Sequence, residues 1–386
     1  MFQTANANIV LRRSAFFGAL FSASALLPLC SAHANGFEVL HTFTGKKDGG
    51  YPWGALVMDK TGNLYGTSWI GGQFKAGTVF RFTRSGKETV LHSFDCSTEG
   101  CAPDSRLLLD KSGNFYGAAP QGGVNGYGGF FELAPNGDEN VILFVGNDGG
   151  SPNAGLIRDA AGNLYGTASG GTEDNPGTVF EVASGSGTIT TLFAFDGLGD
   201  GGVPEGDLVR DKQGNLYGTT LYGGASDDGV VFRLRPGGKE EVLHSFGGAD
   251  GNAPGAGLIM DRAGNLYGTT SSGGANDDGT VFRLAPDGTE TVLHSFTGND
   301  GAEPLSDLVM DGAGNLYGTA AYGGLPGYGV VFKLAPDGTE TLLHAFRGTD
   351  GREPFAGLVA DGRGHLYGTT AWGGAYDSGT VFRVSE

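Results

Sequence analysis

The sequence predicts an all-β protein, a seven-bladed β-propeller whose blades are four-stranded antiparallel sheets. Three observations predict this fold. Glycine accounts for 74 of the 386 residues, and it recurs with a period of about 50 residues rather than being scattered. Each period holds four short runs rich in β-branched and aromatic residues, bounded by Gly, Asp and Pro. The chain also starts with a run of the fourth type and ends with a run of the third type, as expected if the two ends complete one blade.

The period is set by the motif G-N-L-Y-G-T, which occurs five times intact and twice as a variant. Successive motif tyrosines are 49 to 52 residues apart. They are Tyr65, Tyr116, Tyr165, Tyr217, Tyr267, Tyr317 and Tyr367. Repeats of this length are typical of solenoids, propellers and repeat arrays.

Four strands can be placed in each repeat. In the sixth repeat they are 307–311, 315–319, 329–334 and 339–346. Two of the connections are short and carry Gly with Asp, which favours tight hairpins, and the other two are longer loops. We expect strand 37–43 to pair with strand 379–384, which closes the ring and covers its edges.

The N-terminus has the pattern of an export signal. Arg12 and Arg13 precede an apolar run over 15–29, and Ala32-His33-Ala34 offers a cleavage site near Ala34. We therefore expect residues 1–34 to be a signal peptide, residues 35–386 to be the propeller, and the protein to be secreted or periplasmic. The choice between Sec and twin-arginine export stays open. No later segment is apolar over enough residues to span a membrane.

The charge of the chain argues against several partners. Residues 1–34 hold two arginines and no acidic residue, so their removal changes the net charge from −18 to −20. An acidic surface repels phosphate backbones, and we expect no nucleic-acid partner. The expected partner is a polysaccharide or a surface protein, and the expected oligomeric state is a monomer.

Cys96 and Cys101 are the two cysteines outside the signal peptide. In an oxidising compartment, two cysteines this close in one loop predict a disulfide. Two thiolates alone cannot complete a tetrahedral zinc site. We expect no cofactor and no metal.

Residues that recur in every repeat are expected to be structural. An aspartate precedes each x-x-G turn, where a carboxylate can accept backbone N–H groups. These residues are Asp59, Asp110, Asp159, Asp211, Asp261, Asp311 and Asp361. A histidine occupies one position of the fourth strand in five repeats, and Phe144 and Phe193 replace it in two, which favours a packed position over a general base.

The paired aspartates Asp227-Asp228 and Asp277-Asp278 are candidate calcium ligands, because calcium prefers carboxylate and carbonyl oxygens. They lack the D-x-D-x-D-G spacing, and turn capping is the favoured interpretation.

The repeat A-G-L-x-x-D-x-x-G-N-L-Y-G-T-T, followed by G-T-V-F-R-L and D-G-T-E-T-V-L-H-S-F, resembles the GloVer tandem repeat of exported bacterial proteins. The resemblance covers essentially all of 35–386, and the strand order is similar to that of NHL-type propellers. The resemblance implies the propeller fold and an exported protein, but no established activity.

Aromatic residues gather in the loops of the first, sixth and seventh repeats, on the face opposite the tight hairpins. We expect them to form a ligand-binding cluster that stacks against sugar rings. The alternative is that they pack the seam where the ring closes, and the sequence leaves both open. The residues are Tyr51, Trp53, Trp69, Phe74, Tyr322, Tyr328, Phe355, Trp372 and Tyr376.

The sequence favours an exported propeller that acts as a non-catalytic binding or scaffold module, with glycans as one suitable ligand class. The alternative is a polysaccharide lyase or glycoside hydrolase with its active site at the mouth of the central channel. Asp104 with Arg106, and Glu205 with Asp207, depart from the repeat near that channel, but no motif identifies catalytic residues among them.

Overall fold

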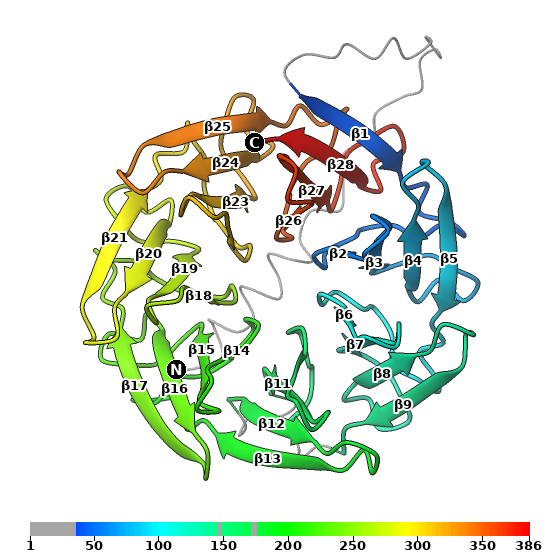
Figure 1. The fold of residues 1–386 in the computed structure, drawn as a ribbon, viewed down its shortest axis with the longest axis horizontal. Helices are drawn as coiled ribbons and strands as arrows, with labels where there is room; N and C mark the ends of the chain where they lie inside the picture. Colours follow the sequence, from blue (N-terminus) through cyan, green and yellow to red (C-terminus); the bar gives the residue numbers. More distant parts are fainter. Residues whose placement is uncertain (1–35, 146–148, 171–175) are drawn as a thin grey trace. The chain divides into compact units, whose positions relative to one another are not determined.

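The computed structural model describes residues 36–145, 149–170 and 176–386, so the predicted signal peptide lies outside the described residues. The described chain contains twenty-eight β-strands and no helix. The strands form seven four-stranded antiparallel sheets arranged in a ring, which confirms the seven-bladed propeller (Figure 1). None of the described residues forms a helix long and apolar enough to cross a membrane.

Each blade runs from a short inner strand at the central channel to a long outer strand at the rim. Blade 1 consists of β2 (Val57–Met58), β3 (Leu64–Ser68), β4 (Thr78–Phe82) and β5 (Glu88–Ser93). Blade 2 is β6 (Leu108–Leu109), β7 (Phe115–Ala119), β8 (Gly129–Leu133) and β9 (Glu139–Leu143); blade 3 is β10 (Ile157–Arg158), β11 (Leu164–Ala168), β12 (Thr178–Val182) and β13 (Ile189–Ala194). Blade 4 is β14 (Val209–Arg210), β15 (Leu216–Thr220), β16 (Val230–Arg235) and β17 (Lys239–Ser245); blade 5 is β18 (Ile259–Met260), β19 (Leu266–Thr270), β20 (Thr280–Leu284) and β21 (Glu290–Ser295). Blade 6 is β22 (Val309–Met310), β23 (Leu316–Ala320), β24 (Val330–Leu334) and β25 (Glu340–Ala345); blade 7 is β26 (Val359–Ala360), β27 (His365–Thr370), β28 (Thr380–Ser385) and β1 (Phe37–Thr42).

The ring closes as predicted. Strand β1 pairs antiparallel with β28, from Phe37 opposite Val384 to Thr42 opposite Thr380. The observed bounds differ from the predicted ones by one residue. The backbone N–H of Ser385 also donates to the carbonyl of Gly36 at 3.0 Å, so the two ends of the propeller are hydrogen-bonded neighbours.

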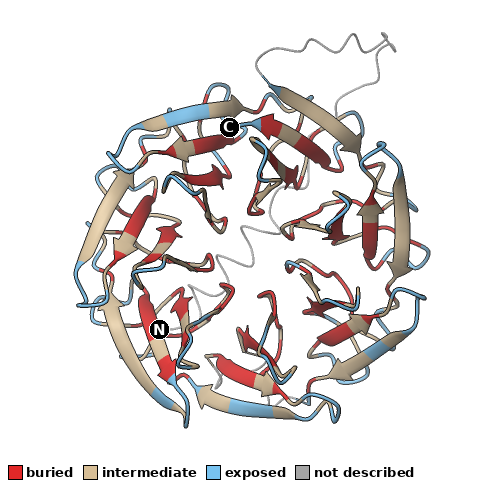
Figure 2. Cartoon of the chain, viewed as in Figure 1, coloured by how far each residue is buried: buried red, intermediate tan, exposed pale blue. Residues whose placement is uncertain are grey.

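The core lies between blades, in the two middle strands of each (Figure 2). The third strand places a phenylalanine with no exposed surface, such as Phe282, against the motif glycine of the second strand. Packing across the closing seam follows the same pattern, because Phe43 and Val381 of blade 7 share a cluster with Leu56, Leu64 and Phe80 of blade 1. Each blade therefore depends on its neighbours for burial.

The motif aspartates are turn anchors, as their recurrence suggested. In blade 4, Oδ1 of Asp211 accepts the backbone N–H groups of Gln213 (2.9 Å) and Asn215 (2.8 Å). Its Oδ2 accepts from the Asn215 side chain at 2.6 Å and from the Tyr217 hydroxyl at 3.0 Å. At the equivalent Asp59, hydrogen bonds from Thr61, Asn63 and Tyr65 outweigh burial and lower the pKa to about 2. The aspartate thus fixes both the hairpin and the motif tyrosine.

Eleven described residues other than glycine adopt a left-handed backbone, and seven of them form one recurring set. These seven all precede a proline, with φ from 49° to 57°. Tyr51 shows their use: its N–H donates to the carbonyl of Ser378 in the preceding blade, and its carbonyl accepts from Trp69 of its own blade. The seven are Tyr51, Ala102, Ser151, Val203, Ala253, Glu303 and Glu353. A left-handed backbone costs free energy in residues with a Cβ, above all in the β-branched Val203. The hydrogen bonds that it allows link each blade to its neighbour at the entrance of the channel.

Candidate functional site

The segments that lead into the inner strands build the mouth of the central channel. Each segment contributes one residue, four positions before its inner strand, to a ring at the entrance. The residues are Trp53, Asp104, Asn153, Glu205, Gly255, Leu305 and Phe355, and they line one recess. Three of the seven residues in this mouth ring are polar, and the other four are aromatic, aliphatic or glycine. The recess has a volume of about 100 Å³ and opens to solvent.

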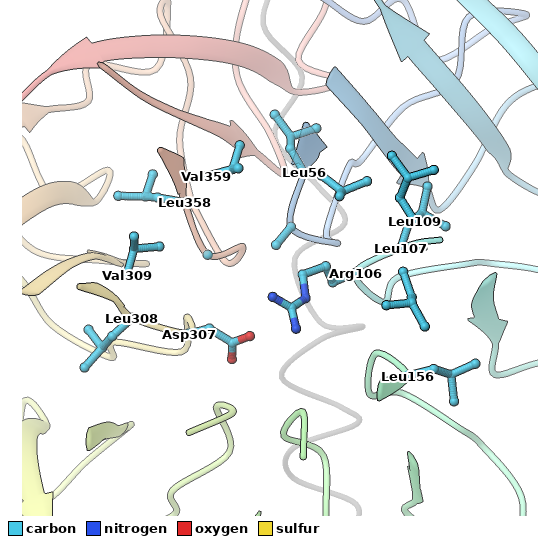
Figure 3. A pocket seen from close by; sticks show the side chains of 14 residues that line it. Leu56, Arg106, Leu107, Leu109, Leu156, Asp307, Leu308, Val309, Leu358 and Val359 are labelled. Carbon is cyan, nitrogen blue, oxygen red and sulfur yellow. The ribbon is translucent and has the colours of Figure 1, made fainter. Parts of the chain in front are cut away.

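A second ring, which we call the neck, is formed by the residues two positions further along each segment, and most of them line the same recess. Three of the seven are charged, namely Arg106, Asp207 and Asp307. Arg106 Nη2 lies 2.9 Å from Asp207 Oδ2, and Figure 3 shows the guanidinium and the Asp307 carboxylate facing one another across the channel. The two aspartates also fix neighbouring blades, because Asp207 accepts the N–H of Gly155 and Asp307 accepts the N–H of Gly257.

The neck groups perturb one another's ionisation. Burial and the nearby Asp207 carboxylate raise the pKa of Asp307 to about 6, although Arg106 opposes the shift. Asp207 in turn raises the pKa of Arg106 against the effect of burial. The arginine therefore stays charged, and Asp307 holds a proton more readily than a free carboxyl does.

Below the neck the channel becomes apolar. Every inner strand contributes an aliphatic residue at its first position, for example Val57, Leu108 and Val309. A cavity of about 260 Å³ is lined by these aliphatic residues together with Arg106 and Asp307 (Figure 3). A polar ligand is therefore favoured at the mouth and the neck but not deeper in the channel.

Four of the predicted aromatic residues form a continuous row at the mouth, which we call the aromatic ledge. The centroids of Tyr322 and Phe355 are 6.4 Å apart, and those of Phe355 and Trp53 are 6.2 Å apart. Trp53 and Trp69 stack with a centroid distance of 4.9 Å and an interplanar angle of 17°. The aromatic ledge thus crosses blades 6, 7 and 1, and two of its members, Trp53 and Phe355, also belong to the mouth ring.

Two other predicted residues pack the seam between blades 7 and 1. The rings of Tyr51 and Trp372 are 4.1 Å apart, and the guanidinium of Arg352 lies 5.3 Å from the centre of the Trp372 ring. Arg352 is held by Glu353 at 2.7 Å and by Asp377 at 3.1 Å. These contacts correspond to the alternative interpretation in which loop aromatics pack the closing seam.

The remaining three aromatics are separate from both groups. Phe74, Tyr328 and Tyr376 are 51%, 41% and 63% exposed and, within the described part of the chain, make no ring contact with the other six. The structure therefore divides the nine predicted residues into a ledge of four, a seam pair and three exposed rings.

The charged candidates are partnered differently from the way the sequence grouped them. Arg106 pairs with Asp207, although the sequence placed Arg106 with Asp104 and Asp207 with Glu205. Asp307 was not singled out at all. The sequence pattern that marks Asp307 is its departure from the repeat: Asp207 and Asp307 occupy the position at which three other repeats have Gly155, Gly257 and Gly357.

The disulfide and the turn capping expected from the sequence are both present. Cys96 and Cys101 form a disulfide, as expected. The first aspartate of each D-D-G pair caps a turn: Asp227 accepts the N–H of Gly223 and Asp277 that of Gly273, both at 2.9 Å.

Known structures share the fold at low identity. Virginiamycin B lyase from Staphylococcus aureus aligns with a TM-score of 0.62 and 14% identity, covering 91% of this chain and 99% of that one. A streptogramin B lyase structure gives 0.63 and 14%, covering 90% and 97%. The extracellular domain of a putative hybrid two-component system from B. thetaiotaomicron gives 0.60 and 14%, covering 90% of this chain and 39% of that one. Likeness at this identity is evidence for the fold alone.

Sequence comparison is more specific. No curated protein matches the chain. The Gloeobacter/Verrucomicrobia repeat matches it three times, over residues 28–226, 101–263 and 206–386. The chain therefore belongs to the Gloeobacter/Verrucomicrobia repeat family.

Proposed function

We propose that this propeller is an exported, non-catalytic binding module that holds a carbohydrate at the mouth of its central channel. One observation carries the proposal: the aromatic ledge runs into the mouth ring, so that Trp53 and Phe355 face the same recess as Asp104, Asn153 and Glu205. Export through the signal peptide 1–34 is part of the proposal.

The chemistry of the two halves suits a sugar. The C–H faces of a pyranose pack against aromatic rings, which offer a large contact area at a low entropic cost. Carboxylate and amide groups accept and donate hydrogen bonds to hydroxyls and orient the ligand. A chain of sugars lying along the ledge would insert one substituent into the recess of about 100 Å³.

The alternative is a polysaccharide lyase or hydrolase at the channel mouth. One observation favours it, because Asp307, with its pKa of about 6, faces Arg106 and so resembles a base beside a charge-neutralising group. Binding without catalysis is better supported, because Asp207 and Asp307 already hold the backbone of neighbouring blades.

A glycan array followed by affinity measurements tests the proposal. We expect Trp53→Ala and Trp69→Ala each to weaken binding of the best glycan at least about tenfold, since a lost stacking contact of about 1.4 kcal/mol has that effect. Tyr376→Ala is the matched control, because Tyr376 is an exposed ring of the same face outside the ledge. Circular dichroism checks the fold of each variant.

Unchanged affinity in both tryptophan variants would refute binding at the ledge. The same glycans are then incubated with the protein and assayed for new reducing ends and unsaturated products. Product formation that Arg106→Gln and Asp307→Asn abolish would replace the proposal with the catalytic alternative.

A further inference from the structure

The outer rim of the propeller carries a set of titratable side chains at the seams between blades. The histidine of an outer strand faces a carboxylate from the loop that follows it and a glutamate at the start of the next outer strand. At the seam of blades 1 and 2 the three are His92, Glu99 and Glu139. At the seam of blades 4 and 5 they are His244, Asp250 and Glu290. In both sets one imidazole nitrogen and two carboxylate oxygens lie within 4.8 Å of one another.

The distances resemble those between ligands of one small cation. His92 Nε2 lies 2.9 Å from Glu99 Oε2 and 3.3 Å from Glu139 Oε1, and His244 Nε2 lies 2.9 Å from Asp250 Oδ2. Ligands bound tetrahedrally to zinc at about 2.0–2.1 Å are about 3.3 Å apart. The three side chains of the first set are only 13–18% exposed, so little bulk water competes for them.

The balance of charge supplies a second, independent argument. Each set brings two carboxylates together with a single imidazole, so a proton or a cation must separate them. Oε1 of Glu290 is buried from solvent and has no hydrogen-bond donor within the described chain. In each set the imidazole can offer at most one positive charge to two carboxylates.

Other seams show that packing does not require this arrangement. At the seam of blades 6 and 7, Phe37 takes the place of the glutamate and stacks on His344 at 3.5 Å, while His344 still contacts Asp350. At the seam of blades 5 and 6, His294, Asp300 and Glu340 are the same residue types, but in the described structure their ligand atoms do not converge within 4.8 Å.

Blade 1 reaches the same geometry by a different route. Its loop carries Glu99 rather than aspartate and is closed by the disulfide between Cys96 and Cys101. Glu99 Oε1 also accepts the backbone N–H of Asp95, which orients the carboxylate toward His92. A longer side chain in a clipped loop thus supplies the same contact that Asp250 makes in blade 4.

We propose that the clusters His92–Glu99–Glu139 and His244–Asp250–Glu290 each bind one divalent transition-metal ion, with zinc as the best-suited class. An imidazole with two carboxylates suits zinc and disfavours calcium and magnesium, which prefer all-oxygen sites. Three protein ligands leave a fourth position for water. Each ion joins two neighbouring blades and so acts as a cross-link of the ring rather than as a part of the channel site.

Calorimetric titration of the EDTA-treated, dialysed protein with zinc chloride at pH 7.5 tests the proposal. We expect two equivalents to bind, and each of the variants Glu139→Gln and Glu290→Gln to bind one. The double variant should bind none and should also lose the rise in melting temperature that zinc gives the parent protein. Glutamine keeps the size of the side chain, and circular dichroism verifies the fold.

Glu340→Gln is the matched control and should still bind two equivalents. X-ray absorption at the zinc edge should show nitrogen and oxygen ligands without sulfur. No binding below about 100 μM zinc, two equivalents retained in the double variant, or loss of one equivalent in Glu340→Gln would each overturn the assignment.

Discussion

The motif glycine of the second strand offers a direct test of how the blades pack. A Cβ built on Gly268 would lie 2.8 Å from Cζ of Phe282 and 2.9 Å from Cδ2 of Leu258. At the seven equivalent glycines the distance to the phenylalanine ring ranges from 2.5 to 2.8 Å, whereas an ordinary contact is about 3.5–4.0 Å. The ring therefore occupies the space that a side chain would need.

We expect Gly268→Ala to lower the free energy of unfolding by about 1–3 kcal/mol. This is the usual cost of inserting a methyl group into a packed core, and Phe282 is fully buried and has no free volume to move into. The same substitution in an exposed strand would instead stabilise by about 0.5–1 kcal/mol, because alanine loses less backbone entropy than glycine. The sign of the effect therefore distinguishes steric conflict from backbone propensity.

Urea unfolding followed by circular dichroism measures the effect. Gly312→Ala is the matched control, since a Cβ added to Gly312 would meet no atom within 4 Å and the residue has no positive φ, and it should be neutral or slightly stabilising. Phe282→Leu should relieve Gly268→Ala, with a coupling energy of at least about 1 kcal/mol in the double-mutant cycle. A Gly268→Ala variant as stable as Gly312→Ala, or strict additivity in the cycle, would refute the packing argument.

Two further predictions concern carboxylates. Burial raises the pKa of Glu88, Glu240 and Glu340 to about 7, so the folded protein favours their protonated form. The stability that this contributes is complete below the usual glutamate pKa and is lost as the pH rises through about 7. Calorimetry in EDTA should therefore show the melting temperature falling between pH 5 and pH 8. The variant in which all three glutamates are replaced by glutamine should show a weaker dependence on pH. Asp211→Ala should cost about 2–4 kcal/mol in urea unfolding, because it leaves the Tyr217 hydroxyl and two backbone N–H groups without their acceptor, while Asp287→Ala, which loses one exposed hydrogen bond, should cost less than about 1 kcal/mol.

Most of the fold follows from local patterns that repeat. The G-N-L-Y-G-T motif marks the second strand, the preceding aspartate marks the hairpin, and the types of the first and last runs predict the pairing of β1 with β28. The inner strands are the exception, since only two residues of each form a ladder, and the sequence suggested about five. The segments before them are shaped by prolines and left-handed residues, which hydrogen-bond to the neighbouring blade rather than extend the ladder.

The site was only partly visible in the sequence, because its contacts join residues that the ring brings together from far along the chain. Arg106 and Asp207 are in blades 2 and 4, and Asp307 reaches the same neck from blade 6. Alternation within strands placed the aromatic residues on one face but could not show that Tyr51 turns to Trp372 while Trp53 turns to Trp69. The left-handed backbone at Tyr51 separates the two directions, and nothing in the local sequence marks it except the proline that follows.

Because β1 pairs with β28, the blade that holds the two chain ends is packed like the others and differs from them only in how the chain connects its strands. Gly36 and Ser385 are already hydrogen-bonded, so a short peptide linker between them would turn the propeller into a covalent circle. Such a circle could be opened in any exposed loop between two blades, giving circular permutants in which every blade is a contiguous stretch of chain. The difference in the free energy of unfolding between such a permutant and the parent would measure how much the blade built from both chain ends stabilises the closed ring.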